Sequence, residues 1–353
     1  NLANNASLDN VDGGFTVFGR VLRGTNVLNY FNGDGTGNGF PTSRGASTAV
    51  EFAKQRDKII AAISAMNADL VGLLEIENDG FAEQSAIADL VRGLNEKAGA
   101  DLWAFVDFNV AKVGTDEITS AMIYRKDKVV QAGVASIGNA APFDYGNRPL
   151  ISQSFKLQQS GELLNLTVVH LKSKGSCPSG STNPDRDFKD GQSCWNATRV
   201  KAANQLMAWL ATNPTGTADK DVLVIGDLNS YAKEDPIHAF VSNGFVDLIA
   251  KHQGSHGYGY VFSGESGYLD HALASTTLSS QVTYATEWHI NADEPIVFDY
   301  NNENKTLQQQ NDLYAVNPFR SSDHDPVIIE LALKTDNPAD FDKDGDVDNK
   351  DIS

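Results

Sequence analysis

Apolar positions in the first hundred residues alternate between strand-like runs and helical spacing. The segments TNVLNYF (25–31) and DLVGLLEI (69–76) are short and mostly apolar, as buried strands are. Apolar residues three and four positions apart predict helices over about 47–67 and 83–97. This alternation of strands and helices is typical of an α/β domain.

The pattern changes further along the chain. Between 103 and 170 it predicts successive strands separated by turn residues, which favours hairpins over parallel crossovers. These strands are ITSAMIYR (118–125), PLISQSFKL (149–157) and ELLNLTVVHL (162–171). A helix around 197–211 precedes three more strands, DVLVIGD (221–227), SGYLDHALAS (266–275) and DPVIIELAL (325–333). We therefore expect an α/β sandwich of two mostly antiparallel sheets, with the polar stretch 290–319 as a surface insertion.

Length, composition and cysteine content narrow the class of protein. The 353 residues, 41% of them hydrophobic, can bury a full α/β core. No window approaches the roughly 18 to 20 continuous apolar residues that cross a bilayer, so we expect no membrane span. Cys177 and Cys194 lie in one Gly/Ser/Asn-rich loop, which favours a disulfide over two free thiols. A disulfide favours an oxidising compartment, and so a secreted, extracellular protein.

The net charge restricts the partners. With 28 Lys and Arg against 46 Asp and Glu the chain carries −18, which is unfavourable for binding a polyanion. The tail 335–353 holds seven Asp against Lys343 and Lys350, a net of −5, so the rest of the chain still carries −13. A local basic groove or bound cations must offset this charge if the partner is nucleic acid.

Polar residues at the ends of late apolar strands suggest phosphodiester chemistry, which needs a cation, a base and an acid. One strand ends in GDLNS, which places Asp227 and Asn229 on the same side of the chain. Asp323 and His324 precede another strand, and such a pair can bind a metal or relay a proton. Asp270 lies within an apolar strand and needs a partner, such as a protonated His324. Each motif alone also has a structural explanation, as a turn, a capped loop or a salt bridge.

Three polar residues mark earlier strands. Glu75 ends an apolar strand and offers the hard oxygen that Mg²⁺ prefers. His170 ends another strand, close to Lys172 and Lys174. Asn29 lies among apolar neighbours, where an Asn is usually just hydrogen-bonded, and a single His at a strand end is as readily a surface residue. Only their combination with the later motifs gives them meaning.

The joint order of the motifs resembles the endonuclease/exonuclease/phosphatase superfamily, which includes the pancreatic-type deoxyribonucleases. Within it the chain is most similar to large secreted bacterial nucleases, in the stretches NVLNYFN (26–32), LLEIEN (73–78), HLKSKGSC (170–177), DGQSCWNATR (190–199) and RSSDHDPV (320–327). The resemblance implies a deoxyribonuclease-like, four-layered α/β sandwich over 25–334. A lead-in segment, 1–24, would precede this catalytic domain, and an acidic tail, 335–353, would follow it.

The resemblance also implies roles for the residues around the reacting phosphate. Glu75, helped by Asn29 and Asp323, would hold Mg²⁺ or Mn²⁺ on the scissile phosphate. His324, oriented by Asp270, would deprotonate or position the attacking water.

The remaining motifs would act on the nucleophile and the leaving group. Asp227 with Asn229 would align the nucleophile and the phosphate, and His170 would protonate the leaving oxygen. Relatives pair this histidine with a carboxylate, for which Asp116 and Glu117 are equal candidates here.

Basic residues near the motifs are candidates for binding the substrate backbone. Arg148, in GNRPLIS, resembles an arginine that reaches the target phosphate with its fixed fork of donors, although it could equally be a surface residue. Lys172, Lys174 and Arg199 would extend this positive track.

The acidic tail fits a twelve-residue calcium loop, 340–351, with Gly345 at the sixth position, where the turn requires glycine. The side-chain positions would be Asp340, Asp342, Asp344, Asp348 and Asp351, and Asp346 would use its backbone carbonyl. The last position is Asp where sensor proteins have Glu, as in dockerin-type repeats. The alternative is a solvated acidic tail without bound Ca²⁺.

Three functions compete on this evidence. The first is a secreted, metal-dependent endonuclease, acting as a monomer on DNA, with RNA as a second substrate, and with low sequence specificity. The second keeps the chemistry but acts on a phospholipid or a small phosphodiester, which the charge of −13 outside the tail favours. The third is a noncatalytic binding module tethered through the calcium tail. The presence of all the candidate catalytic residues argues against it, because a binding module has no need of them.

Overall fold

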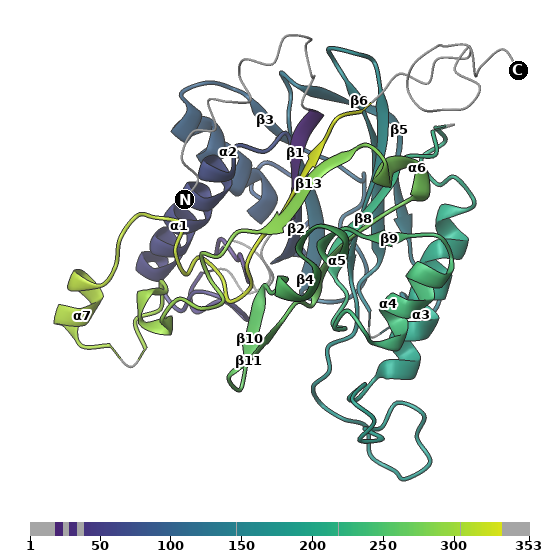
Figure 1. Ribbon diagram of the computed structural model, residues 1–353. Coiled ribbons are helices and arrows are strands. Elements are labelled where there is room, and N and C mark those ends of the chain that lie inside the picture. The colour runs from purple at the N-terminus through teal and green to yellow at the C-terminus, as the bar shows by residue number, and fades with distance from the viewer. Residues whose placement is uncertain are drawn as a thin grey trace, which may run out of the picture.

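The computed structural model describes residues 28–33, 39–145, 147–217, 219–303 and 305–333, together with the backbone of 18–23. Most of the expected lead-in segment and all of the predicted calcium loop lie outside these residues. Two six-stranded sheets stack at the centre of the molecule, and helices flank them on both sides (Figure 1).

Both sheets are mixed but mostly antiparallel. The first has the order β13 (Val282–Glu287), β14 (Val327–Leu331), β1 (Phe18–Arg23), β2 (Leu70–Glu77), β4 (Ile118–Arg125) and β3 (Trp103–Phe105). The second has the order β5 (Val129–Gly138), β6 (Leu150–Leu157), β7 (Leu163–His170), β8 (Val222–Asp227), β12 (Asp270–Ala274) and β9 (Val246–Asp247). Among the strands that the structure describes, β1 pairs with β2 and β7 with β8 in parallel, and the other pairs are antiparallel.

Each sheet is covered on its outer face by a pair of helices. The pair α1 (Ala49–Met66) and α2 (Ala86–Ala98) lies against the first sheet, and α3 (Asn196–Leu210) and α4 (Asp235–Ser242) lie against the second (Figure 1). The smaller elements are α5 (Leu248–Gln253), η1 (Gly254–His256), β10 (Tyr260–Phe262), β11 (Glu265–Gly267), α6 (Thr276–Ser279), η2 (Ile296–Phe298) and α7 (Leu307–Asp312). No helix in the described ranges is long and apolar enough to cross a bilayer.

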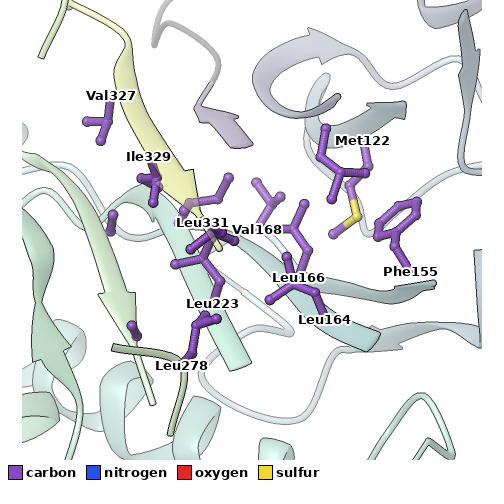
Figure 2. Close-up of a cluster of buried hydrophobic side chains, with 14 of the residues drawn as sticks. Met122, Phe155, Leu164, Leu166, Val168, Leu223, Leu278, Val327, Ile329 and Leu331 are labelled. Atoms are coloured by element: carbon purple, nitrogen blue, oxygen red, sulfur yellow. The ribbon is translucent and has the colours of Figure 1, made fainter. Parts of the chain in front are cut away.

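Three apolar clusters separate the layers. The largest fills the space between the two sheets, where Met122 and Ile329 of the first meet Leu166, Val168 and Leu223 of the second (Figure 2). The others lie between each sheet and its helices. The layers are therefore helix, sheet, sheet and helix, which confirms the predicted four-layered α/β sandwich.

Most predicted elements form close to their expected bounds, but the first predicted strand is wrong. The chain enters the sheet earlier, as β1, inside the expected lead-in segment. In the segment predicted as a strand, the described residues contribute a single bridge, from Tyr30 to Ile76. The backbone of Asn29 is left-handed (φ 39°), which interrupts an extended strand at that point. The stretch 290–319 crosses the surface with η2 and α7, as expected of an insertion.

Close approach of the two sheets depends on glycine at one position of β2. A Cβ on Gly72 would lie 2.7 Å from Ile225 Cδ1 and 2.8 Å from Val168 Cγ2, both in the opposite sheet. We predict that Gly72→Ala overpacks this interface and lowers the free energy of unfolding by about 1–3 kcal/mol, measured by urea denaturation. Gly175→Ala is the control, because its Cβ would meet nothing within 4 Å. Equal midpoints for the two variants would contradict the prediction.

Candidate active site

The candidate catalytic side chains lie at one edge of the stacked sheets because of the directions in which their strands run. In the second sheet, β7 and β8 are parallel and end at His170 and Asp227, whereas β12 runs the opposite way and begins at Asp270. The register pairs Asp227 with His170 on one side and with Asp270 on the other. These three residues therefore form one row across adjacent strand ends.

The first sheet supplies the facing half of the site. Glu75 lies near the end of β2, and Asp323 and His324 directly precede β14, which runs antiparallel to the β1 and β2 pair. Both positions therefore fall at the same edge. His324 Nδ1 contacts Asp270 Oδ2, so the loop before β14 meets the first residue of β12. This contact joins the two sheets at the site.

Three residues of the site have a left-handed backbone, with φ of 39° at Asn29, 59° at Glu75 and 47° at Asn229. Asn tolerates this region, but for other residues it costs roughly 1–2 kcal/mol. At Glu75 it coincides with a β-bulge, because the pairing of β2 with β4 shifts between Leu73 and Ile76. A bulge changes the direction of a side chain, so this one sets where the Glu75 carboxylate points.

Asn29 is held beside Glu75 by backbone contacts. The N–H of the next residue, Tyr30, donates to Glu75 O at 3.1 Å. The carbonyl of Asn29 accepts a hydrogen bond from Gln55 Nε2 at 3.4 Å and passes so close to Gly45 that a Cβ there would lie 2.0 Å from it. Gly45 itself has φ +79°, so two constraints require glycine at this position.

His324 is fixed on two sides. Burial alone would lower its pKa, but the Asp270 carboxylate, as a charge and as a hydrogen-bond acceptor, raises the pKa to about 9. The ring of Tyr260, from the β10–β11 hairpin, packs against the imidazole with a centroid distance of 4.2 Å. No sequence pattern singled out Tyr260, because its role depends on a contact made only in the folded chain.

Asp325 anchors the loop that carries Asp323 and His324. Its Oδ1 accepts three backbone hydrogen bonds, of 3.0, 2.7 and 3.1 Å, from the N–H groups of residues 290, 291 and 292. Its Oδ2 lies 2.9 Å from His289 Nδ1. The motif DHDP contained this residue, but only tertiary contacts separate its structural role from that of Asp323.

Asn29, Glu75 and Asp323 fit the binding of a hard divalent cation. Burial raises the pKa of Glu75 to about 7, and the charges of Asp227 and Asp323 raise it while that of Arg148 lowers it. Asn29 Oδ1 is buried and has no hydrogen-bond donor among the described residues. An amide oxygen and two crowded carboxylates are the donors that Mg²⁺ or Mn²⁺ prefers. In the described ranges no three His, Cys, Asp or Glu side chains lie together as a metal site, and this set has two such side chains beside the amide.

The second half of the row is tightly hydrogen-bonded. Asp227 accepts two hydrogen bonds from Asn229, at 2.7 Å from its backbone N–H and 2.7 Å from its side-chain Nδ2. The same carboxylate lies 3.5 Å from His170 Nε2. All three side chains are buried, with at most 7% exposed. Both carboxylates considered for His170 form ion pairs with arginines: Asp116 lies 3.2 Å from Arg148 Nε, and Glu117 lies 3.7 Å from Arg44 Nε. The carboxylate beside His170 is that of Asp227.

The predicted basic track is only partly present. Arg148 lies near the site, because its charge lowers the pKa of Glu75. Lys172 follows His170 by two residues, and its Nζ lies 4.9 Å from the centroid of the Trp195 ring. Lys174 instead forms an ion pair with the buried Glu234. The expectation that Arg199 binds substrate was wrong, because its side chain is fully buried.

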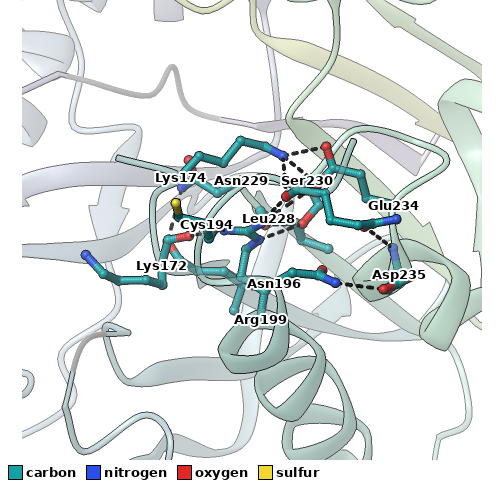
Figure 3. Close-up of polar contacts among 12 residues, drawn as sticks. Lys172, Lys174, Cys194, Asn196, Arg199, Leu228, Asn229, Ser230, Glu234 and Asp235 are labelled. Atoms are coloured by element: carbon teal, nitrogen blue, oxygen red, sulfur yellow. Dashed lines mark hydrogen bonds and ion pairs between the residues drawn. The ribbon is translucent and has the colours of Figure 1, made fainter. Parts of the chain in front are cut away.

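Arg199 instead ties together the loops behind the site (Figure 3). Its guanidinium donates to Lys172 O, Cys194 O, Gln192 O and Ser230 Oγ. The first of these loops leaves β7 after His170, and the last carries Asn229. Cys194 is bonded to Cys177, which confirms the predicted disulfide and fixes one end of this network.

The sequence of the chain matches a known protein family. The model of the Endonuclease/Exonuclease/phosphatase family matches residues 10–324. The chain belongs to this family. Endonuclease/Exonuclease/phosphatase enzymes are mostly hydrolytic phosphoesterases and generally depend on divalent metal ions. No curated protein matches the chain significantly.

Solved structures confirm the Endonuclease/Exonuclease/phosphatase fold. A family protein from Bacteroides thetaiotaomicron is 16% identical, with a TM-score of 0.54 over 88% of this chain and 97% of that chain. Mannosyl-6-phosphatase from the same species is 16% identical, with a TM-score of 0.53 over 88% and 98%. The human nocturnin catalytic domain is 14% identical, with a TM-score of 0.52 over 91% and 95%. At such identities the likeness concerns the fold alone.

The metal set predicts a pH-dependent effect of Mg²⁺ on stability. A cation must displace the proton of Glu75, whose pKa is about 7, so its affinity should rise as the pH passes through 7. We expect excess Mg²⁺ to raise the Tm more at pH 8 than at pH 6, and Glu75→Gln to lose this increase. Glu83→Gln, at an exposed position, is the control. An equal Mg²⁺-induced shift in both variants would exclude Glu75 as a ligand.

Proposed function

We propose that this protein is a secreted, Mg²⁺- or Mn²⁺-dependent endonuclease that hydrolyses phosphodiester bonds of DNA, with RNA as a second substrate and with low sequence specificity. The observation that carries the proposal is that two histidine–carboxylate pairs meet at one edge of the stacked sheets: His170 with Asp227 in the row of strand ends, and Asp270 of that row with His324 from the facing loop. Two histidines are thus available for the two proton transfers of phosphodiester hydrolysis.

The two histidines have different partners and so different tasks. Asp270 contacts Nδ1 of His324, so we assign the proton of the attacking water to the other ring nitrogen, Nε2. The same carboxylate raises the pKa of His324 to about 9, so at neutral pH the imidazole is mostly protonated and positions the water, and it accepts the proton as the pH approaches 9. A divalent cation held by Glu75, Asp323 and Asn29 would polarise the phosphate and offset its charge.

The other pair serves the remaining steps of the reaction. Asp227 and Asn229, locked to each other, present a fixed acceptor and amide for aligning water and phosphate. His170, beside Asp227, delivers the proton that the leaving oxygen needs.

Local charge supports a nucleic acid substrate despite the net charge of −18. An open groove next to the catalytic row is lined by four cations against two carboxylates. The cations are Arg44, Arg148, Lys172 and Lys201, and the carboxylates are Asp116 and Asp144. A positive groove on a negative protein directs a polyanion to one place on the surface.

Secretion is part of the proposal and is supported by the disulfide, which is typical of oxidising compartments. We further propose that the protein acts as a monomer and that the tail loop 340–351 binds Ca²⁺, for stability or attachment and not for catalysis.

Cleavage of supercoiled plasmid tests the proposed activity. We expect nicking with Mg²⁺ that chelator abolishes, and a loss of roughly 10²- to 10⁴-fold in rate for both His170→Ala and His324→Ala. His238→Ala, at an exposed position on α4, should nick at the parent rate.

Failure of the parent protein to nick with Mg²⁺, Mn²⁺ or Ca²⁺ would contradict the endonuclease assignment. Hydrolysis of a phospholipid or a small phosphodiester in its place, lost in the same two variants, would support the second candidate function. Binding of DNA that survives in both variants without any hydrolysis would support a noncatalytic module.

A further inference from the structure

The groove beside the site is lined by none of the candidate catalytic residues at the strand ends. It has a volume of about 1330 Å³ and lies between the loop before β6 and one face of α3. Residues 195, 198, 201, 205 and 208 recur at helical spacing along that face and line the groove. Lys172, two residues after His170, and Arg148, whose charge acts on Glu75, also line it, so the groove adjoins the site.

Trp195 is a fixed aromatic ring on one wall of this groove. Its indole Nε1 donates to Gly175 O at 2.9 Å and to Ser176 O at 3.2 Å, and Lys172 Nζ lies 4.9 Å from the ring centroid. The backbone of Trp195 is left-handed (φ 66°), a conformation that persists only where neighbouring contacts impose it. Here the adjoining Cys194, in its disulfide, is one such constraint.

Tyr145 is an exposed aromatic ring on the opposite, loop-borne wall. Its side chain is 88% exposed, so it contributes little to the packing of the protein. Lys201 of α3 is a further cation of the lining. The groove thus combines two aromatic rings with a line of cations, which is the composition of surfaces that bind single-stranded nucleic acid.

We propose that this groove is a subsite for the unpaired nucleotides that flank the scissile phosphate, with bases stacked on Trp195 and Tyr145 and phosphates near Lys172 and Lys201. The inference rests on the proposed nuclease function and makes it more specific. Bases in a duplex are already stacked on one another, so only an unpaired strand offers its base faces to the rings. The protein should therefore prefer single-stranded over double-stranded substrate.

Steady-state cleavage of a labelled oligothymidylate and of a duplex containing it tests the subsite. Tyr145→Ala should raise the KM for the single strand about tenfold because a stacking interaction is lost, and Lys201→Gln should raise it because a phosphate contact is lost, both with kcat unchanged. Their turnover of bis(p-nitrophenyl) phosphate, which has no flanking nucleotides, should equal that of the parent. Tyr284→Ala and Lys97→Gln, exposed positions on β13 and α2, are the matched controls.

Equilibrium binding of the same labelled strand in EDTA reads the groove without turnover. Both variants should weaken binding, and Lys201→Gln should lower the slope of log K against log salt concentration by about 0.7, as for one lost phosphate contact. A strand that binds but is not cut would overturn the proposed nuclease function and leave the subsite standing.

Three results would overturn the subsite itself. The first is an unchanged KM and unchanged binding in both variants. The second is an equal effect on single strand and duplex, which would indicate general electrostatic attraction. The third is a parallel loss of bis(p-nitrophenyl) phosphate turnover, which would indicate a structural role for these residues.

Discussion

The contact between His324 and Asp270 is the interaction on which the site depends, because it spans the two sheets. Neither partner has a reason to be buried without the other: an isolated buried carboxylate or imidazolium would be costly. The contact forms only when β12 and the loop before β14 meet at one height. The apolar cluster between the sheets sets that height, so the core and the catalytic geometry are parts of one constraint (Figure 2).

The site around Glu75 holds more negative than positive charge. Burial, and then the charges of Asp227 and Asp323, raise the pKa of Glu75 to about 7, and Arg148 offsets this increase only in part. A bound divalent cation would offset the negative charge of these carboxylates. It would also supply the positive charge that attracts a phosphate to the site. Behind the site, Arg199 holds the loops after β7 and β8 in place through backbone carbonyls (Figure 3).

The ends of the strands could be predicted from the sequence better than the loops could. Apolar runs that stop at His170 and Asp227 mark strand ends, and a polar residue at such a point is visible without a structure. The pairing that makes these residues neighbours is not visible, because β-register is a property of several strands together. The first strand was misplaced because the apolar residues on both sides of Asn29 resemble a strand. The left-handed backbone at Asn29, which interrupts a strand, is not visible in the sequence.

Residues whose roles depend on distant contacts could not be assigned from their surroundings in the chain. Arg199 stands in a helix whose sequence gives no sign of burial, yet it is fully enclosed. Tyr260 and Trp195 look like ordinary aromatic residues until the fold places one against His324 and the other at the groove. In each case the information lies in tertiary packing and not in local pattern.

The central claim is that His324 and Asp270 act as one unit across the two sheets. A double-mutant cycle measures this directly, with kcat/KM for plasmid nicking determined for Asp270→Asn, His324→Ala and the double variant. The account predicts strong non-additivity, with the double variant no slower than His324→Ala alone. Additive losses would show that the two residues act independently and would contradict the account.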